Sequence, residues 1–188
     1  MSEIRSELKN CKRIVVKAGS SSLVHPETGK LDLVKVERLI RILSDFKNQG
    51  KDVILVSSGA IAVGCDVLGL SRRPEILPMK QACAAIGQGE LMMLYQKIFQ
   101  EYNHKAAQVL LTFGTVTRTG TGGMYTKIAA AEIATHAGAH VAILESTDLT
   151  LVQTLIEGED VGTLFVEQKN RKFDLLGYIV NKEYLNQE

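Results

Sequence analysis

Short apolar runs rich in β-branched residues recur along the chain and are separated by stretches with helical spacing. Runs of this kind are typical of buried strands, and they occur at residues 14–16, 53–56, 109–111, 141–144 and 163–166. Helices are predicted at residues 33–43, 78–102, 124–137 and 149–156. Within the second helix, Gly87 and Gly89 are expected to form an interruption. Because strands alternate with helices, we predict an α/β fold with a mainly parallel sheet and helices on both faces.

The size and composition of the chain narrow the class of protein. Its 188 residues suit a single domain, and 45% hydrophobic with 23% charged residues is ordinary for a soluble globular protein. A formal net charge of +1 does not favour nucleic acid or an anionic membrane as a partner. The three cysteines have no metal-like spacing, and the chain shows neither a signal core nor a membrane-spanning run. We therefore expect a cytoplasmic protein.

Three loops of small residues stand at strand ends or lead into helices, at 18–22, 57–60 and 119–123. Ligands of parallel sheets bind beyond the carboxyl ends of the strands, so these loops are the first places to look for chemistry. Lys17 ends the first strand beside Gly19, a pairing that suits a phosphate but that also fits a lysine which simply reaches water. The turn at 57–60 exposes N–H donors and hydroxyls, and it can equally be a helix cap without a ligand.

The glycine-rich segment 120–127 gives a stronger signal. Lys127 falls in the first turn of a predicted helix, where a cation is unfavourable unless an anion offsets it, so a phosphate site is the better interpretation. The segment matches neither the Walker pattern nor the dinucleotide fingerprint. We interpret the four histidines as structural or solvent-exposed, and the sequence indicates no metal site formed by them.

Six segments in order resemble the successive motifs of the glutamate 5-kinase family, within the wider amino acid kinase family. They are IVVKAGSSSL (14–23), VILVSSGAIAVG (53–64), QACAAIGQGELM (81–92), AAQVLLT (106–112), GTGGMYTKIAAAEIA (120–134) and EGEDVGTLF (157–165). The resemblance implies a three-layer sandwich that phosphorylates the γ-carboxylate of L-glutamate with ATP and Mg²⁺, the first step of proline biosynthesis. It also implies a homo-oligomer packed through residues 78–102.

The resemblance assigns roles to individual residues. Lys17 would contact the transferring phosphate, with Gly19 and Ser20 in the phosphate loop. Glutamate would be held by Ser58, Gly59 and Ala60. The residues that would bind the nucleotide phosphates are Thr121, Gly122, Gly123, Met124 and Lys127. We expect Lys17 and Lys127 to face one cleft, with Ser58 near it on the acceptor side.

The chain departs from the family pattern between Thr112 and Gly120. Members of the family normally carry an Asn-Glu-Asn-Asp acceptor motif, a Gly-Asp-Asn-Asp motif and a nucleotide strand there, whereas this chain has only Phe113–Thr119. From Thr112 to Lys127 it has no Asp, Glu or Asn. We also expect the protein to lack the RNA-modification-like domain that follows in some members. We expect the physical protein to contain a further central segment; the alternatives are a non-catalytic binding or regulatory module, or a related kinase acting on acetylglutamate, aspartate, carbamate or a nucleotide.

Overall fold

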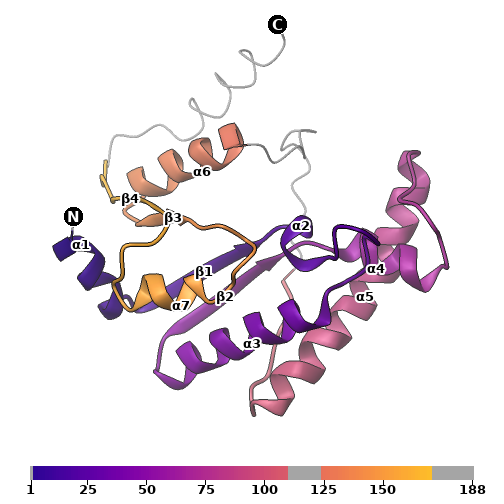
Figure 1. The fold of residues 1–188 in the computed structure, drawn as a ribbon, viewed down its shortest axis with the longest axis horizontal. Helices are drawn as coiled ribbons and strands as arrows, with labels where there is room; N and C mark the ends of the chain where they lie inside the picture. Colours follow the sequence, from indigo (N-terminus) through magenta and orange to yellow (C-terminus); the bar gives the residue numbers. More distant parts are fainter. Residues whose placement is uncertain (1, 110–123, 171–188) are drawn as a thin grey trace, which may run out of the picture. The chain divides into compact units, whose positions relative to one another are not determined.

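The computed structural model describes residues 2–109 and 124–170 (Figure 1). The chain forms two compact units, one made of residues 1–109 with 145–160 and the other of residues 110–144 with 161–188. None of the described helices is long and apolar enough to cross a membrane.

The first unit contains a parallel pair of strands, as the alternating pattern predicts. Strand β1 (Arg13–Ala18) pairs with β2 (Asp52–Ser57), with Arg13 opposite Asp52 and Ala18 opposite Ser57. The helical elements of this unit are α1 (Ser2–Glu7), η1 (Leu8–Asn10), α2 (Ser20–Leu23), α3 (Leu33–Asn48), α4 (Ala60–Val67), α5 (Leu77–Glu101) and α7 (Leu151–Ile156). The α/β class and the parallel pairing are therefore confirmed.

The core of this unit lies on one face of the strand pair. Ile14 and Ala18 of β1 pack in one cluster with the apolar stripe of α3, formed by Val36, Leu39, Ile40, Leu43 and Phe46. Burying each large aliphatic side chain contributes about 1.5–3 kcal/mol, so this stripe fixes α3 against the sheet. On the other face, Val15, Ile54 and Val56 remain 46–58% exposed. Helix α5 joins the same core through Leu91 and Tyr95.

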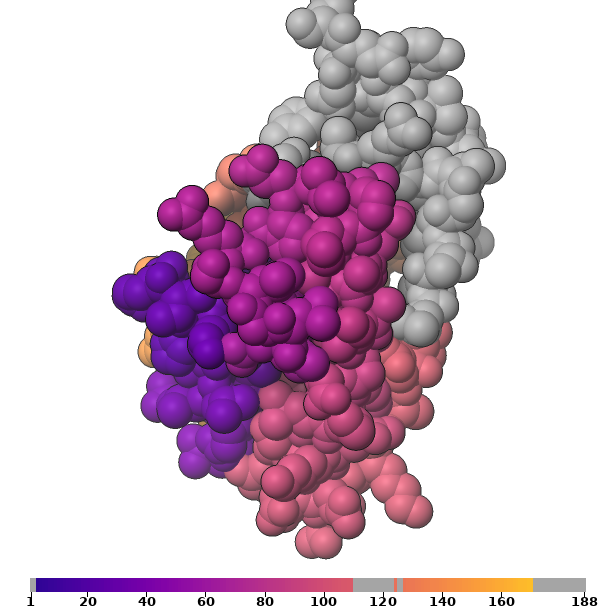
Figure 2. All heavy atoms as spheres, turned by 90° about the vertical axis from the view of Figure 1, so that its right-hand side faces the viewer, coloured from indigo at the N-terminus to yellow at the C-terminus, as the bar shows by residue number. Residues whose placement is uncertain are grey.

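Helix α5 runs without a break from Leu77 to Glu101, so the expected interruption at Gly87 and Gly89 is wrong. A β-carbon on Gly87 would overlap the Ala60 carbonyl oxygen of α4, and one on Gly64 would overlap the Cys83 carbonyl oxygen of α5. These glycines therefore allow a close helix contact instead of breaking a helix. Figure 2 shows the side of the unit on which α4 and α5 lie, in magenta to rose.

The second unit contains α6 (Met124–His136), β3 (Val141–Ile143) and β4 (Thr163–Phe165). The helix ends before Gly138, which has a φ of +88° and is the predicted stop. The predicted strands at 141–144 and 163–166 are present, but they pair with each other antiparallel, with Val141 opposite Phe165. The predicted strand at 109–111 falls mostly outside the described residues, and Val109 itself is not in a strand.

Candidate functional site

The two small-residue loops of the first unit lie side by side at the carboxyl ends of β1 and β2. The register places Ala18 opposite Ser57, and the backbone N–H of Ser58 donates to the Ala18 carbonyl oxygen at 3.2 Å. This bond extends the parallel ladder beyond β2 and ties the turn at 57–60 to the loop at 18–22. The structure therefore brings Lys17, Gly19 and Ser58 to one edge of the sheet, as the sequence predicts.

The first loop gathers a positive charge and hydroxyl groups around Gly19. The position of a β-carbon on Gly19 lies 3.4 Å from Lys17 Nζ and 3.8–4.0 Å from the Ser22 and Ser21 hydroxyls. Ser20 then begins the short helix α2. Lys17 is exposed, yet its ammonium lies over the turn and does not extend away from it. A compact charge with nearby hydroxyls can bind phosphate oxygens.

The second loop requires a glycine at its centre. Gly59 has a φ of +122°, which side chains of L-residues rarely adopt, and it forms the N-cap of α4 without any side-chain cap. Ser58 and Ala60 on either side are half-buried. The start of α4 consequently keeps backbone N–H donors, which are suited to an anionic group.

Sequence reasoning missed a buried tyrosine that contacts this loop. The Tyr95 hydroxyl of α5 lies 2.5 Å from Ser57 Oγ at the end of β2, and burial raises the pKa of the Tyr95 phenol. The phenol is therefore neutral near pH 7 and keeps its proton for hydrogen bonding. A spacing of four connects Cys83, Gly87, Leu91 and Tyr95, and this pattern was the available signal.

The third predicted loop is only partly described. Lys127 lies in the first turn of α6 and is exposed, and Met124 begins that helix, whereas Thr121, Gly122 and Gly123 lie outside the described residues. Lys127 belongs to the second unit and Lys17 to the first. Their convergence on one cleft therefore stays a prediction.

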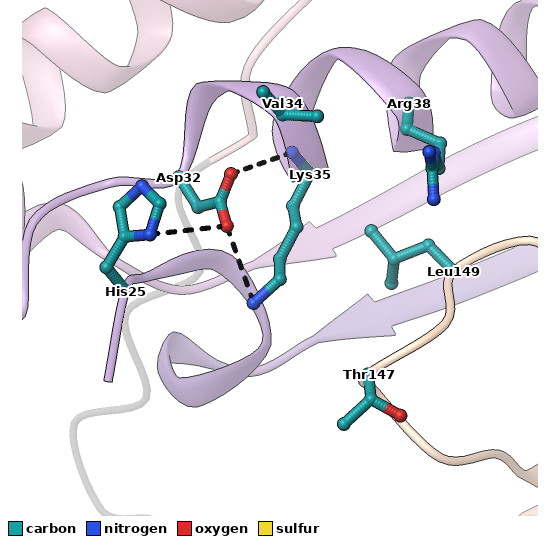
Figure 3. Close-up of a pocket in the computed structure, with 7 residues that line it drawn as sticks. All are labelled: His25, Asp32, Val34, Lys35, Arg38, Thr147 and Leu149. Atoms are coloured by element: carbon teal, nitrogen blue, oxygen red, sulfur yellow. Dashed lines mark hydrogen bonds and ion pairs between the residues drawn. The ribbon is translucent and has the colours of Figure 1, made fainter. Parts of the chain in front are cut away.

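A cavity of about 310 Å³ lies at the start of α3 (Figure 3). It is lined by His25, Asp32, Val34, Lys35, Arg38, Thr147 and Leu149. Asp32 caps the helix by accepting from the Lys35 backbone N–H at 3.1 Å, and its other oxygen lies 3.5 Å from Lys35 Nζ and 3.6 Å from His25 Nδ1. The carboxylate is thus fully engaged in holding the helix start.

The described residues offer no site for a metal ion. They contain no group of three or more His, Cys, Asp or Glu side chains that could hold one. His104 lies 3.3 Å from the Ser44 carbonyl oxygen, and His140 accepts from the Glu167 backbone N–H. Mg²⁺ in a kinase is usually held by one or two carboxylates together with substrate phosphates and water, so it does not need such a group. The described residues therefore assign no particular side chain to a magnesium ion.

The chain is similar to a family of known enzymes and to several individual members of it. Residues 12–136 match the model of the amino acid kinase family. The glutamate 5-kinase of Carboxydothermus hydrogenoformans is 61% identical over 109 residues, which is 58% of this chain and 29% of that protein. The glutamate 5-kinases of Clostridium perfringens and Listeria monocytogenes are 53% and 52% identical over the same share of the chain, and 40% and 39% of their own length. The chain thus matches less than half the length of these relatives.

Proposed function

The chain belongs to the amino acid kinase family, and from this membership we propose that the protein acts as a glutamate 5-kinase. The reaction transfers the γ-phosphoryl group of ATP to the γ-carboxylate of L-glutamate, the first step of proline biosynthesis. The observation that carries the proposal is the joining of the Lys17–Gly19 loop to the Ser58 turn at one sheet edge. High identity to glutamate 5-kinases supports the choice of acceptor.

The chemistry requires positioning and charge stabilisation more than covalent participation by the protein. A γ-carboxylate oxygen attacks the γ-phosphorus, the bond to the ADP oxygen breaks, and γ-glutamyl phosphate forms. Lys17 stabilises the charge on the transferring group, while Gly19 and Ser20 leave room for its oxygens. Ser58, Gly59 and Ala60 hold the acceptor. Mg²⁺ would supply further charge neutralisation when bound with ATP.

Further parts of the proposal concern residues beyond this edge. Thr121, Gly122, Gly123, Met124 and Lys127 bind the nucleotide phosphates in the same cleft as Lys17. The protein works in the cytoplasm as a homo-oligomer with α5 at the subunit contact. Exposed apolar side chains on α5, among them Met79, Ile86 and Met93, support this last point.

A second candidate is a binding module of the same fold without turnover. It is favoured by the absence of Asp, Glu and Asn between Thr112 and Lys127, because acceptor and metal binding need such groups. This candidate keeps the phosphate loop at Lys17 and predicts weak ATP binding with no product.

Trapping of the acyl phosphate with hydroxylamine separates these candidates. The purified protein is incubated with ATP, Mg²⁺ and one acceptor at a time: L-glutamate, N-acetyl-L-glutamate, L-aspartate or carbamate. A glutamate 5-kinase gives hydroxamate with L-glutamate only. Product with another acceptor overturns the choice of substrate, and ATP binding without product for any acceptor overturns the kinase in favour of the module.

A further inference from the structure

One face of α5 packs along residues 57–64, a segment that includes the turn at 57–60, which we propose holds the acceptor. The buried positions of α5 recur every four residues, and they meet segment 57–64 in reverse order. Cys83 lies against Gly64, Gly87 against Ala60, Leu91 against Gly59, and Tyr95 against Ser57, in that order along the helix. The helix therefore contacts this segment at regular intervals along its length. The contact of Tyr95 with Ser57 is the one nearest the sheet.

The direction of the hydrogen bonds at this contact can be assigned. Ser57 Oγ donates to the Ser58 carbonyl oxygen at 3.1 Å. A serine hydroxyl has a single hydrogen, and with that hydrogen on the Ser58 carbonyl oxygen we assign Tyr95 as the donor and Ser57 as the acceptor of the 2.5 Å contact. The chain of donation thus runs from Tyr95 to Ser57 and from Ser57 to the carbonyl group of Ser58.

This chain of bonds fixes the orientation of a peptide group. The carbonyl of Ser58 is held toward the Ser57 side chain, and in a planar trans peptide the following N–H points the opposite way. The N–H of Gly59 is therefore directed away from Ser57, and within the described residues it meets no acceptor. An unused donor that is held in place beside Ser58 is suited to a carboxylate.

We propose that Tyr95 is a positioning residue for acceptor binding: through Ser57 it fixes the Ser58–Gly59 peptide so that the Gly59 N–H binds the acceptor carboxylate. The proposal rests on the proposed function for the identity of the acceptor, L-glutamate. Tyr95 itself does not touch the substrate. Leu91 supports the same turn from one helical turn earlier, packing against Gly59.

The positioning role can be tested without ligand by ¹⁵N–¹H correlation spectra of the ¹⁵N-labelled protein. Tyr95→Phe keeps the ring and removes the donor, so we expect the Gly59 amide resonance to shift and broaden as the peptide samples other orientations. The matched control is Tyr102→Phe, which removes a hydroxyl bonded to Glu37 Oε1 near the end of the same helix. An unmoved Gly59 resonance in Tyr95→Phe, or an equal shift in Tyr102→Phe, overturns the proposal.

A second variant makes the result independent of how well Tyr95→Phe folds. Ser57→Ala breaks the same chain at its middle and should produce the same Gly59 shift. The double variant should then add nothing to Ser57→Ala, because the two residues act in series. Additive shifts would show that Tyr95 does not act through Ser57.

Titration with L-glutamate and, separately, with ATP tests whether the orientation of the Ser58–Gly59 peptide group affects ligand binding. We expect Tyr95→Phe to weaken glutamate binding by about three- to tenfold, the worth of one hydrogen bond, with ATP binding unchanged. Equal weakening of both ligands overturns the role in acceptor binding. If wild type itself does not respond to glutamate, the proposed function fails, while the ligand-free spectra still decide whether Tyr95 orients the Gly59 peptide.

Discussion

At the scale of single residues, Asp32 holds the start of α3 with its carboxylate. Burial favours the neutral form, but the Lys35 backbone N–H and the charges of His25 and Lys35 outweigh it and lower the pKa of Asp32 below its ordinary value of 3.8. A carboxyl group whose pKa is lower in the folded state stabilises the fold above its unfolded pKa. That stability is lost as the pH falls through the folded value.

Asp32→Asn should therefore destabilise the protein in a pH-dependent manner. Asparagine keeps the helix cap but loses the charge, so we expect a loss of about 0.3–1 kcal/mol in the free energy of unfolding at pH 7. The difference from wild type should shrink as the pH falls below 3.8 and disappear once the pH is below the lowered pKa of Asp32 in the folded state. Urea unfolding across this range measures it, with Asp45→Asn near the other end of α3 as control. A difference that is constant with pH would contradict this account.

The set of residues that meet at the sheet edge was only partly predictable from sequence. Lys17, Gly19 and Ser58 stand in small-residue loops beside strand ends, and the sequence pattern could find them. Tyr95 lies 38 residues from Ser57, and a single sequence carries no sign of that pairing. The spacing of four on α5 marks Tyr95 as a core residue without indicating its hydroxyl partner.

At the scale of elements, two glycines of α5 should respond in opposite ways to substitution by alanine. A β-carbon on Gly87 would overlap the Ala60 carbonyl oxygen of α4, whereas one on Gly89 would meet no atom within 4 Å. We expect Gly87→Ala to lower the free energy of unfolding by about 1–3 kcal/mol through overpacking. Gly89→Ala should raise it by up to about 1 kcal/mol, because alanine is the better helix former.

Thermal or urea unfolding measures the free energy of unfolding of both variants. Gly89→Ala serves as the control for Gly87→Ala, because both add one methyl group to the same helix. Changes of the same sign and size would mean that the α4–α5 contact is looser than described. A shift of the Gly59 resonance in Gly87→Ala would further show that the glycine contact sets the position of the turn at 57–60.

The elements were predicted well where local chemistry decides them. The apolar runs at 14–16 and 53–56 fall inside β1 and β2, and α3 begins at its Asp32 cap. The interruption at Gly87 and Gly89 was predicted because glycine has a low helix propensity. The sequence of α5 alone does not show that Gly87 packs against α4. The antiparallel pairing of β3 and β4 was also missed, since strands of three residues carry no sign of their direction.

At the scale of the whole molecule, the interrupted family pattern is the reason to propose a larger protein. Within the first unit, Val15, Ile54 and Val56 form an exposed apolar face, and parallel sheets are normally covered on both faces. The interrupted family pattern lies between Thr112 and Gly120, outside the described residues. A single domain and a further central segment are the arrangement that we propose.

Peptide mapping of protein isolated from its source tests the central segment. Trypsin cleavage after Lys105 and Arg118 would release the continuous peptide AAQVLLTFGTVTR if the chain is joined as written. We expect this peptide to be missing and the intact mass to exceed 20.6 kDa. Its detection together with a mass of 20.6 kDa would establish the junction and leave the binding module as the better proposal.

The central claim is that the carboxyl ends of β1 and β2 form the substrate site, with Lys17 serving the phosphate and Ser58 the acceptor. The most direct test measures the affinities for L-glutamate and ATP in Ser58→Ala and Lys17→Met beside wild type. We predict that Ser58→Ala weakens glutamate binding by about ten- to a hundredfold, the worth of a hydrogen bond to a charged group, and leaves ATP binding nearly unchanged. Lys17→Met should weaken ATP binding and abolish phosphoryl transfer. Equal losses for both ligands in Ser58→Ala, or undiminished transfer in Lys17→Met, would contradict the account.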